Sequence, residues 1–317
     1  MDIRFIIIAV NFIVGTILIV YGVNLMSTGL EKANTYRMKR CLETLTYNLP
    51  LALVTGMILT ATVQSSTAIT VITVGLVNSG LLNLTQAVGI IYGANIGTTI
   101  TAQLMSFKLP YAGYIIIGFG LLIAITAKKK SVKNVGWAIT GLGLMFTGLN
   151  ILNSGVPYIK GGKTAIKLFQ TYGQNPLIGL VLGIITTMLV HSSSATVGLT
   201  IVLFNAGLIS FESALGLTLG DNIGTCITAQ IASIGTNIPA KRTAWAHTLY
   251  NVIGVAIAFV LLMPFSHLIK EITFLLGQDN TRLVANAHTI FNILSALVFL
   301  PLTKYYVKFI QWVIPEK

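Results

Sequence analysis

A duplication is the feature of this chain that most limits what it can fold into. Residues 63–68 read VQSSTA and residues 190–195 read VHSSSA, while residues 93–99 read GANIGTT and residues 220–226 read GDNIGTC. Both pairs share one offset, since 191 − 64 = 127 and 222 − 95 = 127. Two polar motifs that recur in step within apolar sequence indicate a duplicated membrane unit with a site at its centre.

Composition places the chain in a membrane. Hydrophobic residues make up 54% of it and charged residues 9%, whereas about a quarter of a soluble domain is charged. The net charge of +12 comes from basic residues between the apolar runs, which favours contact with anionic lipid headgroups over nucleic-acid binding. A span needs about 20 mostly apolar residues. Runs that qualify lie at residues 5–26, 111–127, 137–152, 244–263 and 283–302. We therefore expect a multi-pass protein of the cell inner (plasma) membrane.

The organisation predicted is one transmembrane domain over residues 1–317, with a first repeat at 11–130 and a second at 133–302. If the serine motif returns the chain to its own side, the first repeat holds three spans, at residues 5–26, 84–106 and 111–127. An odd number of spans makes the second repeat start from the opposite side. The predicted fold is an all-α integral membrane protein with an inverted structural repeat.

Each serine motif predicts a re-entrant helical hairpin. Residues 51–63 and 68–77 flank the first motif, and each segment is only about half a membrane thick. The second motif repeats this pattern around His191. Irregular backbone at that depth persists only where it is buried in protein or lines a wet cavity. The two Asn-Ile-Gly-Thr segments are expected to break the helices that follow the hairpins.

The hairpin tips predict an ion site, because unpaired buried polar groups cost about 2–7 kcal/mol each. Helix N-terminal ends and hydroxyl donors suit an anion such as phosphate, whereas side-chain oxygens suit sodium. Tight helix packing is the alternative role for such clusters. The predicted anion ligands are Ser65, Ser66, Thr67, Ser192, Ser193 and Ser194. The predicted sodium ligands are Gln64, Asn95, Thr98, Thr99, Asp221, Asn222 and Thr225.

Three further residue patterns qualify this prediction. Asp221, whose counterpart is Ala94, serves cation coupling or acts as a neutral helix-breaking group. His191 replaces Gln64 and either contacts an anion or substitutes for the amide as a hydrogen-bonding group. A third motif also occurs twice, as AHTLYN at 246–251 and AHTIFN at 287–292, and each copy places histidine and asparagine on one helix face. We expect it to pair helices or to support the site, and we expect sodium to be the only metal bound and no cofactor. The supporting residues are His191, His247, Asn251, His288 and Asn292.

These motifs resemble those of the type II sodium-dependent phosphate cotransporter family, and we expect a bacterial member. The paired Ser-Ser hairpins, the paired Gly-x-Asn-Ile-Gly-Thr segments and the Ala-His-x-x-Phe-Asn helix carry the likeness, which covers residues 11–302. The sequence departs from the family at His191 and Asp221. The resemblance implies a sodium:phosphate symporter with a central site. On this basis the residues that carry over are Gln64, Ser65, Ser66, Asn95, Thr98, Ser192, Ser193, Asn222 and Thr225.

The sequence therefore predicts a secondary transporter and no enzyme. Its expected partners are inorganic phosphate, sodium and membrane lipid, without nucleic acid, and a homodimer stays open. The rival interpretations are a sodium-coupled carrier of another small anion, a phosphate exporter and an anion channel. A hydrolase that uses His191 and Ser192 is a further rival, although no Gly-x-Ser-x-Gly turn supports it.

Overall fold

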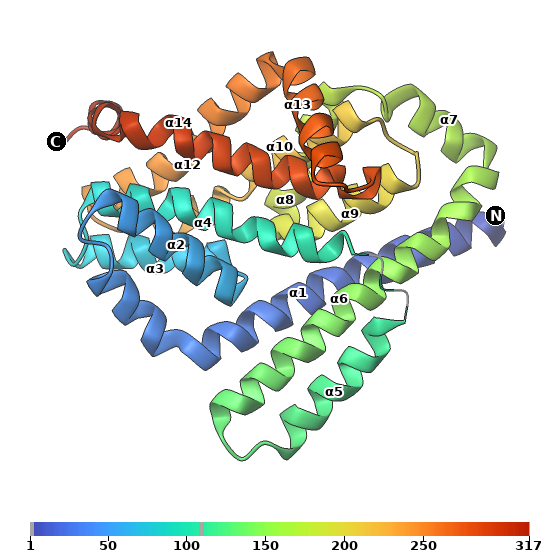
Figure 1. Ribbon diagram of the computed structural model, residues 1–317, viewed down its shortest axis with the longest axis horizontal. Helices are drawn as coiled ribbons and strands as arrows, with labels where there is room; N and C mark the ends of the chain where they lie inside the picture. Colours follow the sequence, from blue (N-terminus) through green and yellow to red (C-terminus); the bar gives the residue numbers. More distant parts are fainter. Residues whose placement is uncertain (1–2, 108, 110, 317) are drawn as a thin grey trace.

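The computed structural model describes residues 3–107, 109 and 111–316; the predicted domain's residues 1, 2 and 317 lie outside them. Every regular element among the described residues is helical, so the prediction of an all-α protein is confirmed (Figure 1). The helices are α1 Ile3–Thr44, α2 Leu49–Val63, α3 Ser66–Asn78, α4 Leu84–Met105, α5 Ala112–Thr126, α6 Lys130–Gly161, α7 Lys163–Tyr172, α8 Pro176–Val190, α9 Ser193–Asn205, α10 Phe211–Gly224, α11 Ile227–Ala232, α12 Ile238–Val260, α13 Leu262–Leu275 and α14 Leu283–Val313.

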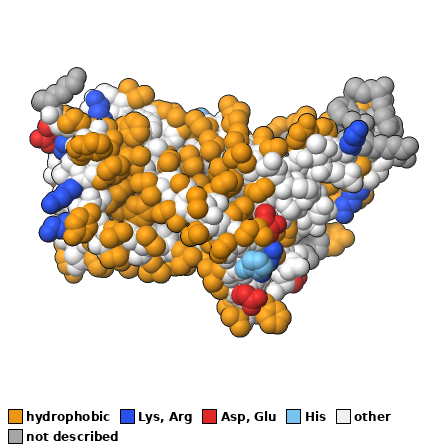
Figure 2. All heavy atoms as spheres, turned by 90° about the horizontal axis from the view of Figure 1, so that it is seen from above, with side chains coloured by type: hydrophobic (Ala, Val, Ile, Leu, Met, Phe, Trp, Pro, Cys, Tyr) orange, Lys and Arg blue, Asp and Glu red, His pale blue; other side chains and the backbone are white. Residues whose placement is uncertain are grey.

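Several of these helices are suited to cross a bilayer. Within the described part of the chain, α1, α6, α12 and α14 are long and apolar enough to span, which makes four spans, or five if the pair α7–α8, bent by 107°, is counted as one span. Hydrophobic side chains cover much of the face in Figure 2, and its charged side chains gather near the two ends and in one group below the centre. A multi-pass membrane protein is therefore the class that the structure supports.

Glycines spaced seven residues apart join α1 to α6. A Cβ added at Gly22 would lie 2.6 Å from the carbonyl oxygen of Gly141, and one at Gly15 would lie 2.9 Å from that of Gly148. Only glycine permits such close backbone contact. The residue numbers rise along α1 as they fall along α6, so the two helices run antiparallel (Figure 1).

The duplication recurs in the ends of the helices. Asn48 N-caps α2 and Asn175 N-caps α8, at the same offset of 175 − 48 = 127. The turns after α3 and α9 contain Gly80 and Gly207, with φ of +74° and +66°, again 127 residues apart. These matched caps and turns give each repeat the same order of two short helices followed by a third helix that packs on the first.

Close packing of that third helix also depends on glycine. A Cβ at Gly93 of α4 would lie 1.9 Å from the Leu53 carbonyl of α2. One at Gly220 of α10 would lie 2.1 Å from the Leu180 carbonyl of α8. Gly93 and Gly220, which lie two residues before the Asn-Ile-Gly-Thr segments, therefore allow α4 to pack closely on α2 and α10 on α8.

The prediction that both Asn-Ile-Gly-Thr segments break a helix is wrong for the first copy. α4 runs without interruption from Leu84 to Met105, whereas α10 ends at Gly224 and α11 starts at Ile227. In the second copy, side chains bond to backbone carbonyls of their own segment: Thr225 to Asp221 (2.8 Å), Cys226 to Asn222 (3.4 Å) and Thr228 to Thr225 (3.0 Å). Such local bonds compete with the helical ladder.

The predicted spans also need correction at their ends. The first apolar run belongs to a much longer helix, α1, of 42 residues. The run at 111–127 forms a helix of only 15 residues, α5, which is about 22 Å long. The run at 244–263 crosses a break at Leu261, where α12 gives way to α13.

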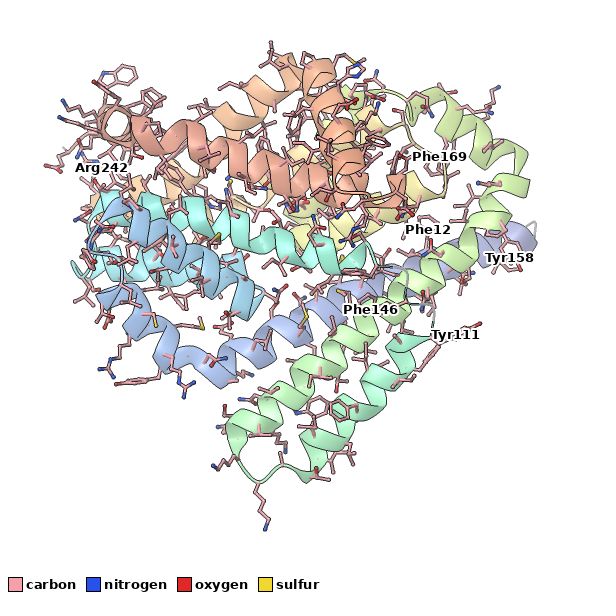
Figure 3. The ribbon with its side chains drawn as sticks, in the orientation of Figure 1. Phe12, Tyr111, Phe146, Tyr158, Phe169 and Arg242 are labelled. Carbon is pink, nitrogen blue, oxygen red and sulfur yellow. The ribbon has the colours of Figure 1, made fainter. Side chains whose placement is uncertain are left out.

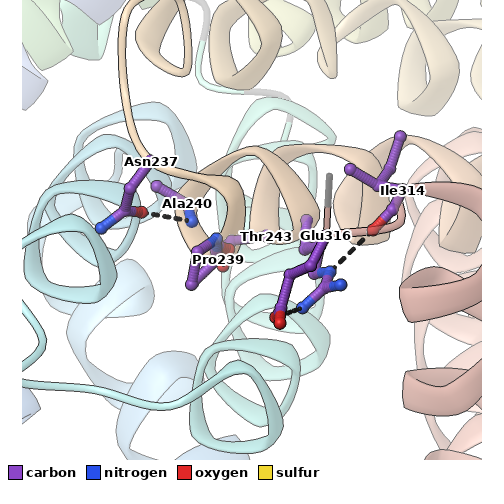
Figure 4. Close-up of polar contacts among 7 residues, drawn as sticks. Asn237, Pro239, Ala240, Thr243, Ile314 and Glu316 are labelled. Atoms are coloured by element: carbon purple, nitrogen blue, oxygen red, sulfur yellow. Dashed lines mark hydrogen bonds and ion pairs between the residues drawn. The ribbon is translucent and has the colours of Figure 1, made fainter.

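Side-chain contacts fix α12 relative to the C-terminal end of α14. Asn237 N-caps α12 by accepting from the Ala240 N–H at 3.0 Å (Figure 4). Arg242 donates from Nε to the Ile314 carbonyl (2.8 Å) and forms an ion pair with Glu316 (2.7 Å). The start of one AHT-containing helix is thereby tied to the end of the other.

Candidate functional site

The first serine motif lies at the junction between α2 and α3. α2 ends at Val63, and Gln64 has φ 59° and ψ 29°, a left-handed conformation uncommon outside glycine. Ser65 is extended and accepts a hydrogen bond from the Ala68 N–H (3.1 Å), which N-caps α3. The Gln64 carbonyl accepts a bond from Ser27 Oγ of α1 at 2.7 Å, so α1 holds the junction in place.

The second serine motif repeats this backbone at the junction between α8 and α9. His191 has φ 53° and ψ 28°, and Ser192 accepts a hydrogen bond from the Ala195 N–H (3.4 Å). Among the described residues, His191 and Gln64 are the only non-glycine positions with positive φ. The two junctions therefore have the same left-handed residue followed by the same serine cap.

Both junctions line one polar cavity of about 180 Å³. The N-terminal turns of α3 and α9 reach this space, and the first N–H groups of a helix lack intrahelical partners. Two helix ends of this kind carry partial positive charge toward the cavity. The motif residues on its lining are Gln64, Ser65, Ser66, Thr67, His191, Ser192, Ser193 and Ser194.

Helix α1 supplies a wall of the cavity that the sequence prediction missed. Asn24, Ser27, Thr28 and Glu31 all lie on the lining. Their spacing of i, i+3, i+4 and i+7 places them on one helix face. That polar stripe beside an apolar run was the signal that could have revealed them.

The residues predicted to bind sodium are divided between the cavity and the core behind it. Gln64 and Thr98 lie on the lining. The others are absent from it: Asn95, Thr99, Asp221 and Asn222 are buried in α4 and α10, and Thr225 is partly buried. The structure therefore brings the six predicted anion ligands together but sets most of the predicted cation ligands apart from them.

Two of the buried residues predicted to bind sodium, Asn95 and Asp221, differ in their hydrogen bonding. Asn95 donates from Nδ2 to Oδ1 of Asn251 at 3.1 Å, which joins α4 to α12. Both carboxylate oxygens of Asp221 are buried without a hydrogen-bond partner among the described residues. An uncompensated buried carboxylate is expensive, so Asp221 is the more unusual of the two.

The third repeated motif, at residues 246–251 and 287–292, makes contacts between helices. Gln103 of α4 donates to Oγ1 of Thr289 in α14 (2.9 Å), and Gln230 of α11 donates to Oγ1 of Thr248 in α12 (2.7 Å). The two glutamines are also 127 residues apart, a match that the prediction did not use. The expected supporting residues His247, His288 and Asn292 are buried. Their ring nitrogens and the Asn292 Oδ1 have no hydrogen-bond partner within the described part of the chain.

No cluster of three or more His, Cys, Asp or Glu side chains suited to a metal ion occurs among the residues that the structure describes. Among the described residues, the cavity lining contains Glu31 and no lysine or arginine. The site thus offers hydroxyls, amides, helix N-termini and a carboxylate. This set can bind a small anion together with a hard cation.

Comparison with known proteins gives a consistent assignment. The sequence profile described as Na+/Pi-cotransporter matches residues 18–154 and 158–278. An uncharacterized Bacillus subtilis protein, YqeW, is 31% identical over 93% of this chain and 95% of its own length. The putative inorganic phosphate export protein YjbB of Escherichia coli is 28% identical over 95% of this chain, which spans 54% of that protein. Sheep sodium-dependent phosphate transport protein 2A is 33% identical over 31% of this chain and 17% of its own length. No solved structure matches significantly.

Proposed function

The chain belongs to the Na+/Pi-cotransporter family, and we propose that it is a sodium-coupled symporter of inorganic phosphate that works by alternating access. The observation that carries this proposal is the single polar cavity lined by both serine motifs. Family membership makes the protein a transporter, and we propose this cavity as the binding place of the transported anion.

Phosphate is assigned to the hydroxyls and helix ends of the two motifs. The N-terminal turns of α3 and α9 offer N–H donors and partial positive charge, and the hydroxyls add neutral donors. Four oxygens of a tetrahedral anion require many donors at once, which two facing helix ends provide better than one. The assigned ligands are Ser65, Ser66, Thr67, Ser192, Ser193 and Ser194.

A coupled cation is supported by the charges around this cavity. Phosphate and the Glu31 carboxylate are both negative, and no basic side chain among the lining residues offsets them. Close like charges repel, so a bound cation would stabilise the loaded site. The buried Asp221 carboxylate, which has no partner among the described residues, is a second place for positive charge. The proposed sodium ligands are Gln64, Asn95, Thr98, Thr99, Asp221, Asn222 and Thr225.

An inverted repeat with re-entrant hairpins is part of the proposal. α2 and α3 have 15 and 13 residues, so each is about 20 Å long and too short for a 30 Å bilayer. This length supports a re-entrant hairpin. The contacts between α1 and α6 support the inverted relation. Gly15 corresponds to Gly141 in the second repeat, and Gly22 corresponds to Gly148. Gly15 contacts Gly148, and Gly22 contacts Gly141. This reciprocal pairing, in which each residue contacts the other's equivalent, is the pattern of a two-fold axis. It supports an inverted relation between the repeats.

A second cavity supports alternating access. It has a volume of about 360 Å³ and is lined by Phe146, Asn150 and Asn153 of α6 and by the C-terminal ends of α4 and α9; Figure 3 labels Phe146 on α6 near α1. Asn150 is the repeat counterpart of Asn24, which lines the first cavity. From the glycine contacts, the two cavities lie roughly 20 Å apart along the α1–α6 pair. We assign the second cavity to the route that opens in the opposite state.

Labelling tests this assignment directly. In a Cys41→Ser background, Ser27→Cys should react with a membrane-impermeant thiol reagent from one side of the vesicle and Asn153→Cys from the other. Sodium plus phosphate should change the two rates in opposite directions. Equal rates from one side at both positions would contradict the two-route assignment.

Net phosphate export is the second candidate, favoured by the likeness to a relative that is named for export. The same site can serve export, because a coupled carrier runs in the direction set by its combined gradients. Efflux from vesicles preloaded with sodium and phosphate would therefore accompany uptake under a symport mechanism. Efflux that persists without sodium on either side would favour an uncoupled exporter.

The decisive test is uptake of labelled phosphate into proteoliposomes. An inward sodium gradient should drive accumulation, and replacement of sodium by choline should remove it. Unlabelled arsenate should compete, because it has the same shape and protonation chemistry. Uptake that is unchanged in choline would reject sodium coupling, and absence of phosphate uptake or counterflow would reject the proposed substrate.

A further inference from the structure

Among the described residues, one carboxylate lines the cavity proposed for phosphate, and the proposed function assigns it no contact with the anion. Glu31 of α1 lies on the lining and is partly buried. The two ion pairs within the described residues join Arg242 to Glu316 and Lys270 to Glu212, so Glu31 takes part in neither. Its hydrogen bond with Thr35 uses the Glu31 backbone carbonyl and leaves the carboxylate oxygens free for a ligand.

Apart from Val23, the other described lining residues carry hydroxyl, amide or imidazole groups, which can donate hydrogen bonds. Hydroxyls of Ser65, Ser66, Ser192 and Ser193 can donate to an oxyanion, as can the N–H groups of the adjoining helix ends. A carboxylate can only accept. Beside an oxyanion it therefore repels every oxygen except one that carries a proton.

Tetrahedral anions differ in this respect. Near neutral pH phosphate and arsenate each retain at least one hydroxyl group, whereas sulfate has none. A protonated oxygen can donate to a carboxylate in a short, charge-assisted hydrogen bond. A sulfate in the same position would place an unprotonated oxygen against the carboxylate, an acceptor against an acceptor. Rejection by an unpaired polar group is an effective means of discrimination.

We propose that Glu31 accepts a hydrogen bond from the protonated oxygen of the bound anion and so makes the cavity select phosphate and arsenate over sulfate. This inference rests on the proposed function of the cavity and adds the chemical class of its substrate: a tetrahedral oxyanion that carries a hydroxyl. No bond to hydrogen is broken, and the proton stays on the anion.

The other half of the molecule provides no equivalent carboxylate. α1 and α6 correspond at an offset of 126, which places Pro157 at the position equivalent to Glu31, since 31 + 126 = 157. The six serine and threonine donors come from both repeats, but the acceptor comes from one. Among the described lining residues, Glu31 is therefore the one group that can accept a hydrogen bond but cannot donate one while it is ionised.

The test measures competition by sulfate for labelled phosphate uptake in proteoliposomes with a sodium gradient. Wild-type protein should prefer phosphate over sulfate by at least ~100-fold, as expected of a site that pairs with a substrate hydroxyl. Glu31→Gln should reduce that ratio about tenfold or more, because the amide can donate to an unprotonated oxygen. Glu31→Asp, which keeps a carboxylate, should retain the preference.

Glu43→Gln is the matched control, because Glu43 is exposed on the same helix and is absent from the cavity lining. It should leave the ratio unchanged. A phosphate-to-sulfate ratio that Glu31→Gln leaves unchanged would overturn the inference. A shift in sodium dependence with the anion preference intact would also overturn it, because Glu31 would then be a sodium ligand. These results leave the proposed function standing, whereas wild-type protein that moves no phosphate would reject both.

Discussion

Around the first serine motif, Gln64 is 9% exposed and Thr101 donates to its Oε1 (2.5 Å), whereas His191 at the second motif is exposed. The helix after the first motif is continuous, and the helix after the second is interrupted at Thr225. Yet the left-handed φ and the serine cap are nearly identical at the two junctions. The backbone that presents donors to the cavity is thus shared, while the groups around it differ.

This contrast separates two parts of the proposed mechanism. Anion binding depends on features that both repeats have, namely a serine cap and a helix N-terminus. Cation coupling and substrate selection depend in addition on carboxylates that only one repeat has, namely Asp221 and Glu31. Equivalent substitutions in the two halves should therefore have similar effects on the first part, and substitutions at the unmatched positions should affect the second.

The largest effect is expected from Ser66→Ala combined with Ser193→Ala. Each change removes a hydrogen bond to a charged ligand, worth about 1.5–3 kcal/mol, so phosphate uptake should fall by more than ~100-fold. Each single variant should lose about tenfold or more, with similar losses in the two halves. Uptake assays in proteoliposomes measure this, with Thr62→Ala, which is exposed on α2, as the control. Normal uptake by the double variant would exclude a shared site.

Equal structural roles for the two repeats predict equal sensitivity at Gly93 and Gly220. An alanine Cβ would clash with the backbone of the facing helix at either position, at 1.9 Å and 2.1 Å. Each variant should lose about 1–3 kcal/mol of stability. Gly75→Ala is the control, because no described atom beyond the adjacent backbone of its own helix lies within 4 Å of the new methyl group, and helix propensity improves. Thermal unfolding in detergent would reveal a difference between the halves if their packing is not equivalent.

Asp221→Asn tests the unmatched carboxylate. Loss of its negative charge should weaken sodium binding, so the sodium concentration for half-maximal uptake should rise about tenfold, or the charge moved per phosphate should change. Glu212→Gln on the same helix removes a carboxylate that is paired with Lys270, and it should leave sodium dependence intact. If both sodium dependence and charge movement stay the same in Asp221→Asn, Asp221 has a structural role only.

The smallest effect is expected from His191→Gln, which gives the second motif the residue of the first. The left-handed backbone and the Ser192 cap do not use the imidazole, and the side chain is exposed. Phosphate uptake should therefore stay within about threefold of wild type. A loss comparable to that of the serine variants would make His191 a direct anion ligand.

The sequence indicated the helical class and the positions of both junctions because the duplication is unbroken between residues 53 and 106. The continuity of α4 could not be read from Gly97 and Thr98, because the same Gly-Thr pair stands at Gly224 and Thr225, where α10 ends. The contribution of α1 was missed because its polar stripe, including Ser27 and Glu31, lies far from the repeated motifs in sequence. The binding roles of the site residues remain predictions.

The most direct test of the central claim is the location of a bound anion. Arsenate scatters strongly enough to be found in an anomalous difference map of crystals grown with sodium. We expect one peak between residues 65–67 and 192–194, within hydrogen-bond distance of serine hydroxyls from both repeats. A peak that contacts only one repeat, or that lies outside this cavity, would contradict a shared anion site.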